Sequence, residues 1–174
     1  MEASDLRSLQ APLKQQYQDD PAQALVTLRA AGTLDDSGVS CSVETGRALV
    51  EAGLHPATGG SGLQACSGDM LLEALAACAG VTLRAVATAL DIPVRGGTVH
   101  VEGDLDFRGT LGVSKEVPVG FQAIRLRLEL DTDATREQLD TLLKLTERYC
   151  VVLQTIRSAT PVTATLSPIT AGHG

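Results

Sequence analysis

Aromatic side chains are scarce in this chain of 174 residues: they account for 2% of it, and tryptophan is absent. The stacking platforms that hold single-stranded nucleic acids are built from such side chains. Basic residues are also in the minority, with 14 Lys and Arg against 21 Asp and Glu, so the formal net charge is −7. Because nucleic-acid binding needs a clustered basic surface, and the basic residues here are scattered, we expect no nucleic-acid partner.

Patterns that bind metals are missing as well. The chain has three histidines, four cysteines and no pair of cysteines separated by two residues. Structural and catalytic zinc sites draw on closely spaced cysteine and histidine ligands. We therefore expect neither a metal nor an organic cofactor.

Long apolar runs free of charge are absent. The longest apolar stretch, residues 70–90, is interrupted by Glu73 and Arg84, whereas a membrane span carries few or no charges. The first 18 residues are charged and polar and lack the apolar core of a signal peptide. We expect a cytoplasmic protein that has no membrane partner and whose cysteines are free or catalytic thiols rather than a disulfide framework.

The periodicity of the apolar residues predicts an α+β fold. Helical spacing occurs in residues 4–18, 69–90 and 135–158, and two-residue alternation predicts a hairpin within 24–44, a short strand at 47–51, and strands at 99–107, 124–130 and 162–166. Because the strands come in consecutive runs, the sheet should be mostly antiparallel. We expect one main domain at 23–170, preceded by a helical extension at 1–22.

The segment 69–90 is apolar on nearly every face and contains Cys78. A helix of this kind is normally buried on all sides, here by a curved sheet or by a second copy of the chain. Cys150 lies on the apolar face of the later helical segment. A single buried cysteine is more often a small hydrophobe than a nucleophile, but two thiols that meet can reduce a peroxide and then form a disulfide.

Two further cysteines are weaker candidates. Cys41 occupies a position on the buried face of its predicted strand, where we expect it to be part of the hydrophobic core. Cys66 precedes the helix at 69–90, and the amides at the start of a helix lower the pKa of a thiol. A surface thiol without a role is an equally good interpretation of Cys66.

The residues around Cys78 and Cys150 resemble two motifs of the OsmC/Ohr family. The first combines Gly59–Gly60 with the run from position 67 to 84, Ser-Gly-Asp-Met-Leu-Leu-Glu-Ala-Leu-Ala-Ala-Cys-Ala-Gly-Val-Thr-Leu-Arg. It is similar to the family's Gly–Gly loop and to its helix with the pattern Leu-x-Ala-Leu-x-Ala-Cys-x-x-x-Thr-Leu. The second is Cys-Val-Val-Leu from position 150, followed by Pro161–Val162. It is similar to the family's cysteine at a helix start ahead of the final strand.

The resemblance implies an OsmC-like fold: an intertwined homodimer in which mostly antiparallel six-stranded sheets wrap central helices. It also implies a cysteine-based peroxidase that reduces organic, lipid-type hydroperoxides. Cys78 would be the peroxidatic thiolate, Cys150 the resolving thiol, and an external dithiol would reopen their disulfide.

In the family, an arginine from an early strand or loop and an acid near the start of the catalytic helix assist the thiolate. The resemblance assigns the acid to Asp69, with Gly68 where proline is usual, and the arginine to Arg47, with Arg29 as the alternative. Val151 replaces a proline that commonly follows the second cysteine, and this change could let the helix continue and alter how Cys150 is presented, so either one helix or a helix pair is expected at 135–158.

Two other functions stay open at this point. One is a non-catalytic OsmC-like module that binds a hydrophobic small molecule at the dimer interface, with Cys78 and Cys150 as apolar lining. The other is a redox sensor in which the disulfide matters more than turnover.

Overall fold

The computed structural model describes residues 3–34, 41–43, 52–63 and 65–166. Its elements, in chain order, are α1 (Ala3–Asp19), η1 (Pro21–Ala24), β1 (Leu25–Leu34), β2 (Cys41–Val43), η2 (Pro56–Thr58), α2 (Ser67–Ala89), β3 (Gly96–Asp106), α3 (Phe107–Thr110), β4 (Ala123–Asp131), α4 (Arg136–Tyr149) and α5 (Val151–Arg157). The predicted α+β class is confirmed, as are the hairpin of β1 with β2 and the two long strands that follow the apolar helix.

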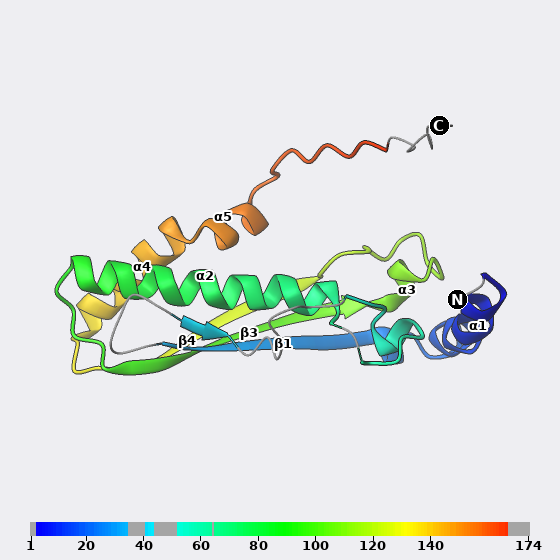
Figure 1. Cartoon of the computed structure of the whole chain (residues 1–174), viewed down its shortest axis with the longest axis horizontal. Coiled ribbons are helices and arrows are strands. Elements are labelled where there is room, and N and C mark those ends of the chain that lie inside the picture. The colour runs from blue at the N-terminus through cyan, green and yellow to red at the C-terminus, as the bar shows by residue number, and fades with distance from the viewer. Residues whose placement is uncertain (1–2, 35–40, 44–51, 64, 167–174) are drawn as a thin grey trace, which may run out of the picture.

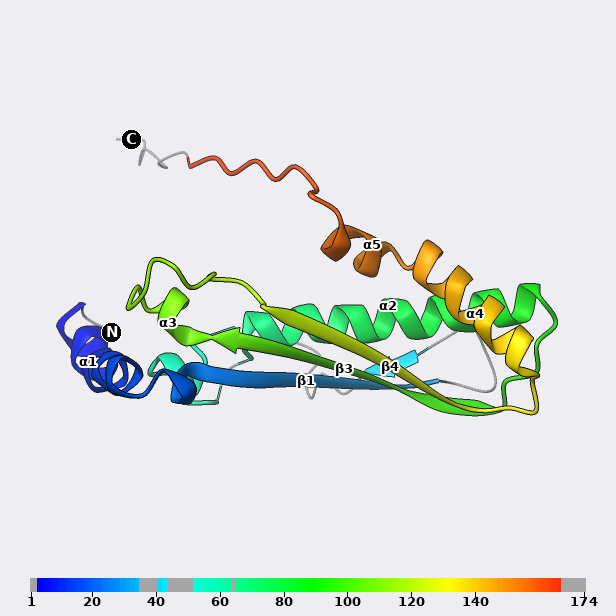
Figure 2. The same cartoon turned by 180° about the vertical axis from the view of Figure 1, so that it is seen from behind.

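The strands form an antiparallel sheet in the order β2-β1-β3-β4. The long helix α2 lies along one face of this sheet and packs on β1 and β3, while α4 and α5 pack on α2 (Figures 1 and 2). The described part of the chain therefore contains a four-stranded sheet rather than six strands. The predicted short strand at 47–51 lies outside the described residues.

The sheet has one dry and one charged face, as its alternation predicts. Val99 and Val101 of β3 are fully buried toward the helices. On the opposite face, Arg125 of β4 forms ion pairs with Glu102 and Asp104 of β3. Pairs of opposite charge that face each other across neighbouring strands support the register.

Helix α2 confirms the prediction of a long apolar helix at 69–90, but a single chain does not surround it. Its inner side buries large apolar residues, among them Leu72, Leu75 and Leu83, while Met70, Leu71 and Val81 stay 37–40% exposed. Among the described helices, α2 is the one long and apolar enough to span a bilayer. The core helix of a soluble protein passes the same test.

Helix α4 begins as predicted, with a capping box between Thr135 and Gln138. The helical segment predicted at 135–158 is divided at Cys150, where the backbone is extended (φ −70°, ψ 104°), so Cys150 precedes the first residue of α5 as the family motif implies. Cys150 keeps both of its main-chain hydrogen bonds at the break. The Cys150 N–H still donates to Thr146, and the Cys150 carbonyl accepts from Gln154, so α5 resumes at once.

The predicted helix at 4–18 is present as α1, which packs at one end of the sheet against η2 and α3. Its Tyr17 is buried, and the Tyr17 hydroxyl donates to the carbonyl of Ala57 at 2.8 Å. This contact joins the extension to the loop before the Gly–Gly pair and not to the region of the two cysteines.

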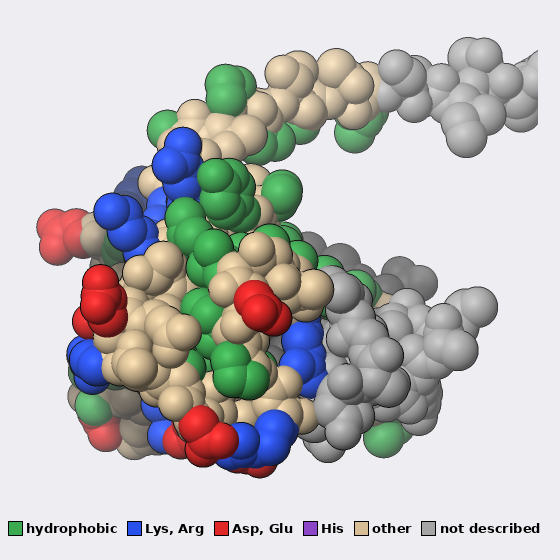
Figure 3. All heavy atoms as spheres, turned by 90° about the vertical axis from the view of Figure 1, so that its left-hand side faces the viewer, with side chains coloured by type: hydrophobic (Ala, Val, Ile, Leu, Met, Phe, Trp, Pro, Cys, Tyr) green, Lys and Arg blue, Asp and Glu red, His purple; other side chains and the backbone are tan. Residues whose placement is uncertain are grey.

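The strand predicted at 162–166 is absent from the single chain. Residues 159–166 form no helix or strand, and Val162 and Leu166 are 89% and 93% exposed. This segment leaves the end of α5 and projects away from the rest of the molecule (Figures 1 and 3). It does not reach an edge of the described sheet, and it pairs with none of the described strands.

Candidate active site

The fold brings Cys78 and Cys150 together. Cys78 lies in the middle of α2 and is half-buried, and Cys150 joins α4 to α5 and is completely buried. Both are free thiols, and the Cys150 thiol donates a hydrogen bond to the sulfur of Cys78. The two residues that the family motifs single out are therefore neighbours across the contact between α2 and the α4–α5 junction.

The helix break at Cys150 also supplies main-chain donors. The first N–H groups of a helix have no partner within that helix. In α5 the first N–H groups donate hydrogen bonds to the two sulfurs. The Val151 and Val152 amides donate to Cys78, and the Val152 and Leu153 amides donate to Cys150. A further donor comes from α2 itself, where the Thr82 hydroxyl oxygen lies 4.0 Å from the Cys78 sulfur.

These contacts separate the pKa values of the two thiols. Burial by itself would raise the pKa of Cys78, but hydrogen bonds from the Val152 amide, the Cys150 thiol, the Thr82 hydroxyl and the Val151 amide outweigh it and lower that pKa. Burial raises the pKa of Cys150 to about 11. The arrangement favours a thiolate at Cys78 and a protonated thiol at Cys150, as nucleophilic and resolving roles require.

The structure does not bring Asp69 to Cys78. Nine residues of α-helix separate them, which is about 13 Å of rise and about two and a half turns, so their side chains point to opposite sides of α2. Burial raises the pKa of Asp69, and the nearby His55 opposes that effect. Arg47 lies outside the described residues, and so does the side chain of Arg29.

Cys66 is also remote from the pair. It precedes the first residue of α2 and is twelve residues from Cys78, about 18 Å along the helix axis. Cys66 cannot reach a sulfenic acid at Cys78 while α2 is intact. Among the described residues there is no group of three or more His, Cys, Asp or Glu side chains that could hold a metal.

Sequence reasoning missed the donors at this site. Thr82 could have been found, because a residue four positions after Cys78 lies on the same face of a helix. The amides of Val151 and Val152 have no such signal, since main-chain N–H groups are common to all residues but proline and become available only where the helix breaks.

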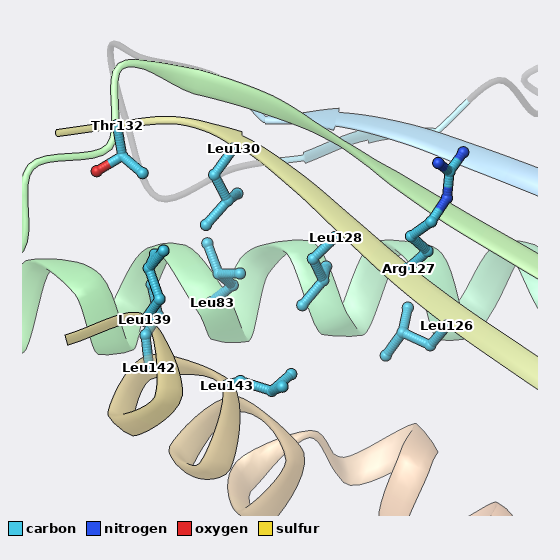
Figure 4. Close-up of a pocket in the computed structure, with 9 residues that line it drawn as sticks. All are labelled: Leu83, Leu126, Arg127, Leu128, Leu130, Thr132, Leu139, Leu142 and Leu143. Carbon is cyan, nitrogen blue, oxygen red and sulfur yellow. The ribbon is translucent and has the colours of Figure 1, made fainter. Parts of the chain in front are cut away.

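A cavity of about 360 Å³ lies between β4, α2 and α4. Figure 4 shows that leucines of all three elements point into it. The lining consists of Leu83, Leu126, Arg127, Leu128, Leu130, Thr132, Leu139, Leu142 and Leu143. Neither thiol lines this cavity, so it is a separate apolar space.

A family model described as OsmC-like protein matches residues 60–165, a span that contains both thiols, α2 and the α4–α5 junction. The chain belongs to the OsmC-like family. Membership confirms the resemblance read from the two cysteine motifs. The fold of this OsmC-like protein is also similar to that of a solved structure, an OsmC-like hydroperoxide resistance protein from Jannaschia sp. CCS1.

That likeness has a TM-score of 0.59 at 18% sequence identity, and it covers 85% of this chain and 97% of the Jannaschia chain. At this identity the comparison shows the fold of the OsmC-like protein and not its activity. The curated proteins include no match to this chain.

Proposed function

We propose that this OsmC-like protein is a thiol-dependent peroxidase that reduces organic hydroperoxides to alcohols. The observation that carries the proposal is the hydrogen-bonded pair of free thiols, in which Cys78 has a lowered pKa and Cys150 a raised one. A similarly folded protein of the family is described as a hydroperoxide resistance protein, which agrees with this chemistry. We place the reaction in the cytoplasm, where thiols are kept reduced.

The reaction proceeds in two steps on the protein. The Cys78 thiolate attacks the distal peroxide oxygen, an S–O bond forms, the O–O bond breaks, and the alkoxide takes a proton and leaves as an alcohol. Cys78 is then a sulfenic acid. The Cys150 sulfur attacks the sulfenic sulfur, its proton goes to the departing hydroxide to give water, and the disulfide forms.

An external dithiol completes the cycle by thiol–disulfide exchange, in which the dithiol is oxidised and both cysteines are returned to thiols. No metal or organic cofactor takes part. The buried Leu75 and Leu153, one turn before Cys78 and three residues after Cys150, make the surroundings apolar. Such surroundings favour an organic hydroperoxide over hydrogen peroxide, because burying an alkyl group is favourable.

The test is consumption of cumene hydroperoxide with dihydrolipoamide as the reductant. Native protein should turn over continuously, Cys78→Ser should be inactive, and Cys150→Ser should turn over more slowly than native protein, because the dithiol must then attack the Cys78 sulfenic acid directly. Cys66→Ser is the matched control and should behave like the native protein, since Cys66 is remote from the pair. Native protein that shows no turnover above the reductant alone would refute the peroxidase.

The leucine-lined cavity favours a second candidate function, the binding of a hydrophobic small molecule without catalysis. Under this function Cys78→Ser should leave binding nearly intact, because neither thiol lines the cavity. Titration with a fluorescent apolar probe, compared between native protein and Cys78→Ser, separates the two functions when it is run beside the peroxide assay.

We also propose that the protein is a homodimer. The exposed apolar side of α2, with Met70, Leu71 and Val81, supports this assembly, as does the projecting segment at 159–166. A second copy could cover both surfaces, and burying apolar area drives most association. Light scattering should give twice the mass of the chain, and a mass equal to one chain at micromolar concentration would contradict the dimer.

A further inference from the structure

Threonines inside helices can direct the hydroxyl to the carbonyl four residues earlier. Two threonines of this chain do so: Thr88 of α2 donates to the carbonyl of Arg84 at 2.9 Å, and Thr155 of α5 donates to that of Val151 at 2.8 Å. Thr82 differs from both. Its hydroxyl lies 4.0 Å from the Cys78 sulfur, which is also four residues earlier, and its side chain is half-buried.

We propose that the Thr82 hydroxyl donates a hydrogen bond to the Cys78 thiolate and is a catalytic residue of the peroxidase. The assignment rests on the proposed function for its catalytic meaning. The contact itself is a property of α2 and of the reduced protein. A hydroxyl can act as donor or acceptor, and an ionised sulfur that accepts a hydrogen bond takes the hydroxyl as donor.

The position of Thr82 gives it a role that the amides of α5 cannot fill. Val151 and Val152 follow Cys150 directly, so any movement of Cys150 toward Cys78 also moves these two donors. Thr82 is fixed one turn from Cys78 on the same helix. It therefore stabilises the thiolate before Cys150 attacks and again when reduction of the disulfide releases it.

During attack on the peroxide, the negative charge passes from the Cys78 sulfur to the departing alkoxide oxygen. The Thr82 hydroxyl keeps its own proton throughout, and the alkoxide is protonated by solvent. The hydroxyl thus acts on the fraction of Cys78 that is thiolate. Removing the hydroxyl should lower the reaction rate at neutral pH and should have no effect on it at high pH, where Cys78 is ionised in any case.

The experiment compares native protein, Thr82→Val, Thr82→Ser and Thr88→Val. Valine keeps the branched shape and removes the hydroxyl, serine restores the hydroxyl, and Thr88→Val removes a helical hydroxyl that bonds to a carbonyl. The pKa of Cys78 is read from the pH dependence of iodoacetamide alkylation on the full chain, followed at the peptide that contains Cys78 by mass spectrometry.

Thr82→Val should raise the pKa of Cys78 by about 0.5 to 1 and slow alkylation about three- to tenfold below that pKa. Its rate should meet the native rate at high pH. Thr82→Ser should stay within about twofold of native, and Thr88→Val should be unchanged. The same pattern is expected in the pH profile of cumene hydroperoxide reduction.

An unchanged pKa in Thr82→Val would overturn the proposal. So would a loss of rate that is equal at all pH values, or one that Thr88→Val shares, since either result would mean a general effect on α2. Alkylation needs no peroxide, so it separates the two claims. Native protein without peroxidase activity would refute the proposed function, while the pKa comparison would still decide whether Thr82 stabilises the thiolate.

Discussion

At the scale of single residues, the two thiols differ in the donors that reach them rather than in their chemistry. Both are buried to some degree, and burial disfavours a thiolate. Each sulfur receives two amides, but Cys78 also receives the Thr82 hydroxyl and the Cys150 thiol, while Cys150 is completely buried and its pKa is raised further by the neighbouring Cys78 sulfur. Of the two thiols, Cys78 is therefore the one favoured as a thiolate, and Cys150 is the one favoured as a protonated thiol.

This difference predicts selective alkylation. At pH 7, iodoacetamide should modify Cys78 at least about tenfold faster than Cys150, because the thiolate is the nucleophile and the pKa of Cys78 is lowered while that of Cys150 is raised to about 11. As the pH rises, the Cys78 rate should level off below the ordinary thiol value of 9.0, while the Cys150 rate is still rising. Peptide mass spectrometry over a pH series measures both rates. Equal rates at pH 7 would contradict the assignment.

Cys78 and Cys150 could be predicted as a pair from their two motifs, because each motif fixes one cysteine in a helical context. Their actual contact could not be predicted, since it depends on how α4 and α5 pack across α2. Asp69 illustrates the limit: its place near the start of the helix suggested a role at the sulfur, and within one chain the pitch of α2 turns it to the side opposite Cys78, so its role stays a prediction.

At the scale of elements, the break between α4 and α5 agrees with the family motif, which places the second cysteine at a helix start. The residues themselves do not show it, because residues 136–157 contain no proline or glycine that would divide a single helix. The extended backbone at Cys150 interrupts it and aims the first amides of α5 at the sulfurs. The capping box of α4, in contrast, was visible in the sequence because it depends on two side chains three positions apart.

Val151→Pro tests this interpretation of the break. Proline is well suited to the first position of a helix, and the extended conformation of Cys150 suits a residue that precedes proline. We expect the melting temperature to be unchanged or slightly raised, with a free energy of unfolding up to about 1 kcal/mol higher. The pKa of Cys78 should rise slightly, because one of its amide donors is lost.

Gln154→Pro is the matched control for that substitution. The Gln154 N–H donates to the Cys150 carbonyl, so proline there removes a helical hydrogen bond and should cost about 3 kcal/mol. Thermal and urea unfolding measure both variants. If Val151→Pro were as destabilising as Gln154→Pro, position 151 would lie within a continuous helix and not at the start of a new one.

At the scale of the whole molecule, a single copy leaves apolar surface without a partner. One side of α2 is exposed, and residues 159–166 project from the body with Val162 and Leu166 almost fully accessible. The alternation that predicted a strand at 162–166 is present, but among the described residues no sheet edge lies within its reach. The second copy proposed above would supply such an edge.

If the segment completes the sheet of a partner, its apolar side should decide the assembly. In a strand, Val162, Ala164 and Leu166 lie on one face and Thr163 on the other. Val162→Asp combined with Leu166→Asp should shift the protein from dimer to monomer, because the partner would have to bury two carboxylates. Thr163→Asp adds charge to the same exposed segment on its opposite face, and it should leave the mass unchanged.

Light scattering of the three proteins at equal concentration measures this effect, and circular dichroism shows whether the fold is intact. The double variant should keep its helical signal, because the segment at 159–166 contributes no helix or strand to its own chain. A dimer that survives the double substitution would place the interface elsewhere, with the exposed side of α2 as the next surface to test. A monomer from Thr163→Asp as well would mean that charge on the segment, rather than burial of its apolar face, controls association.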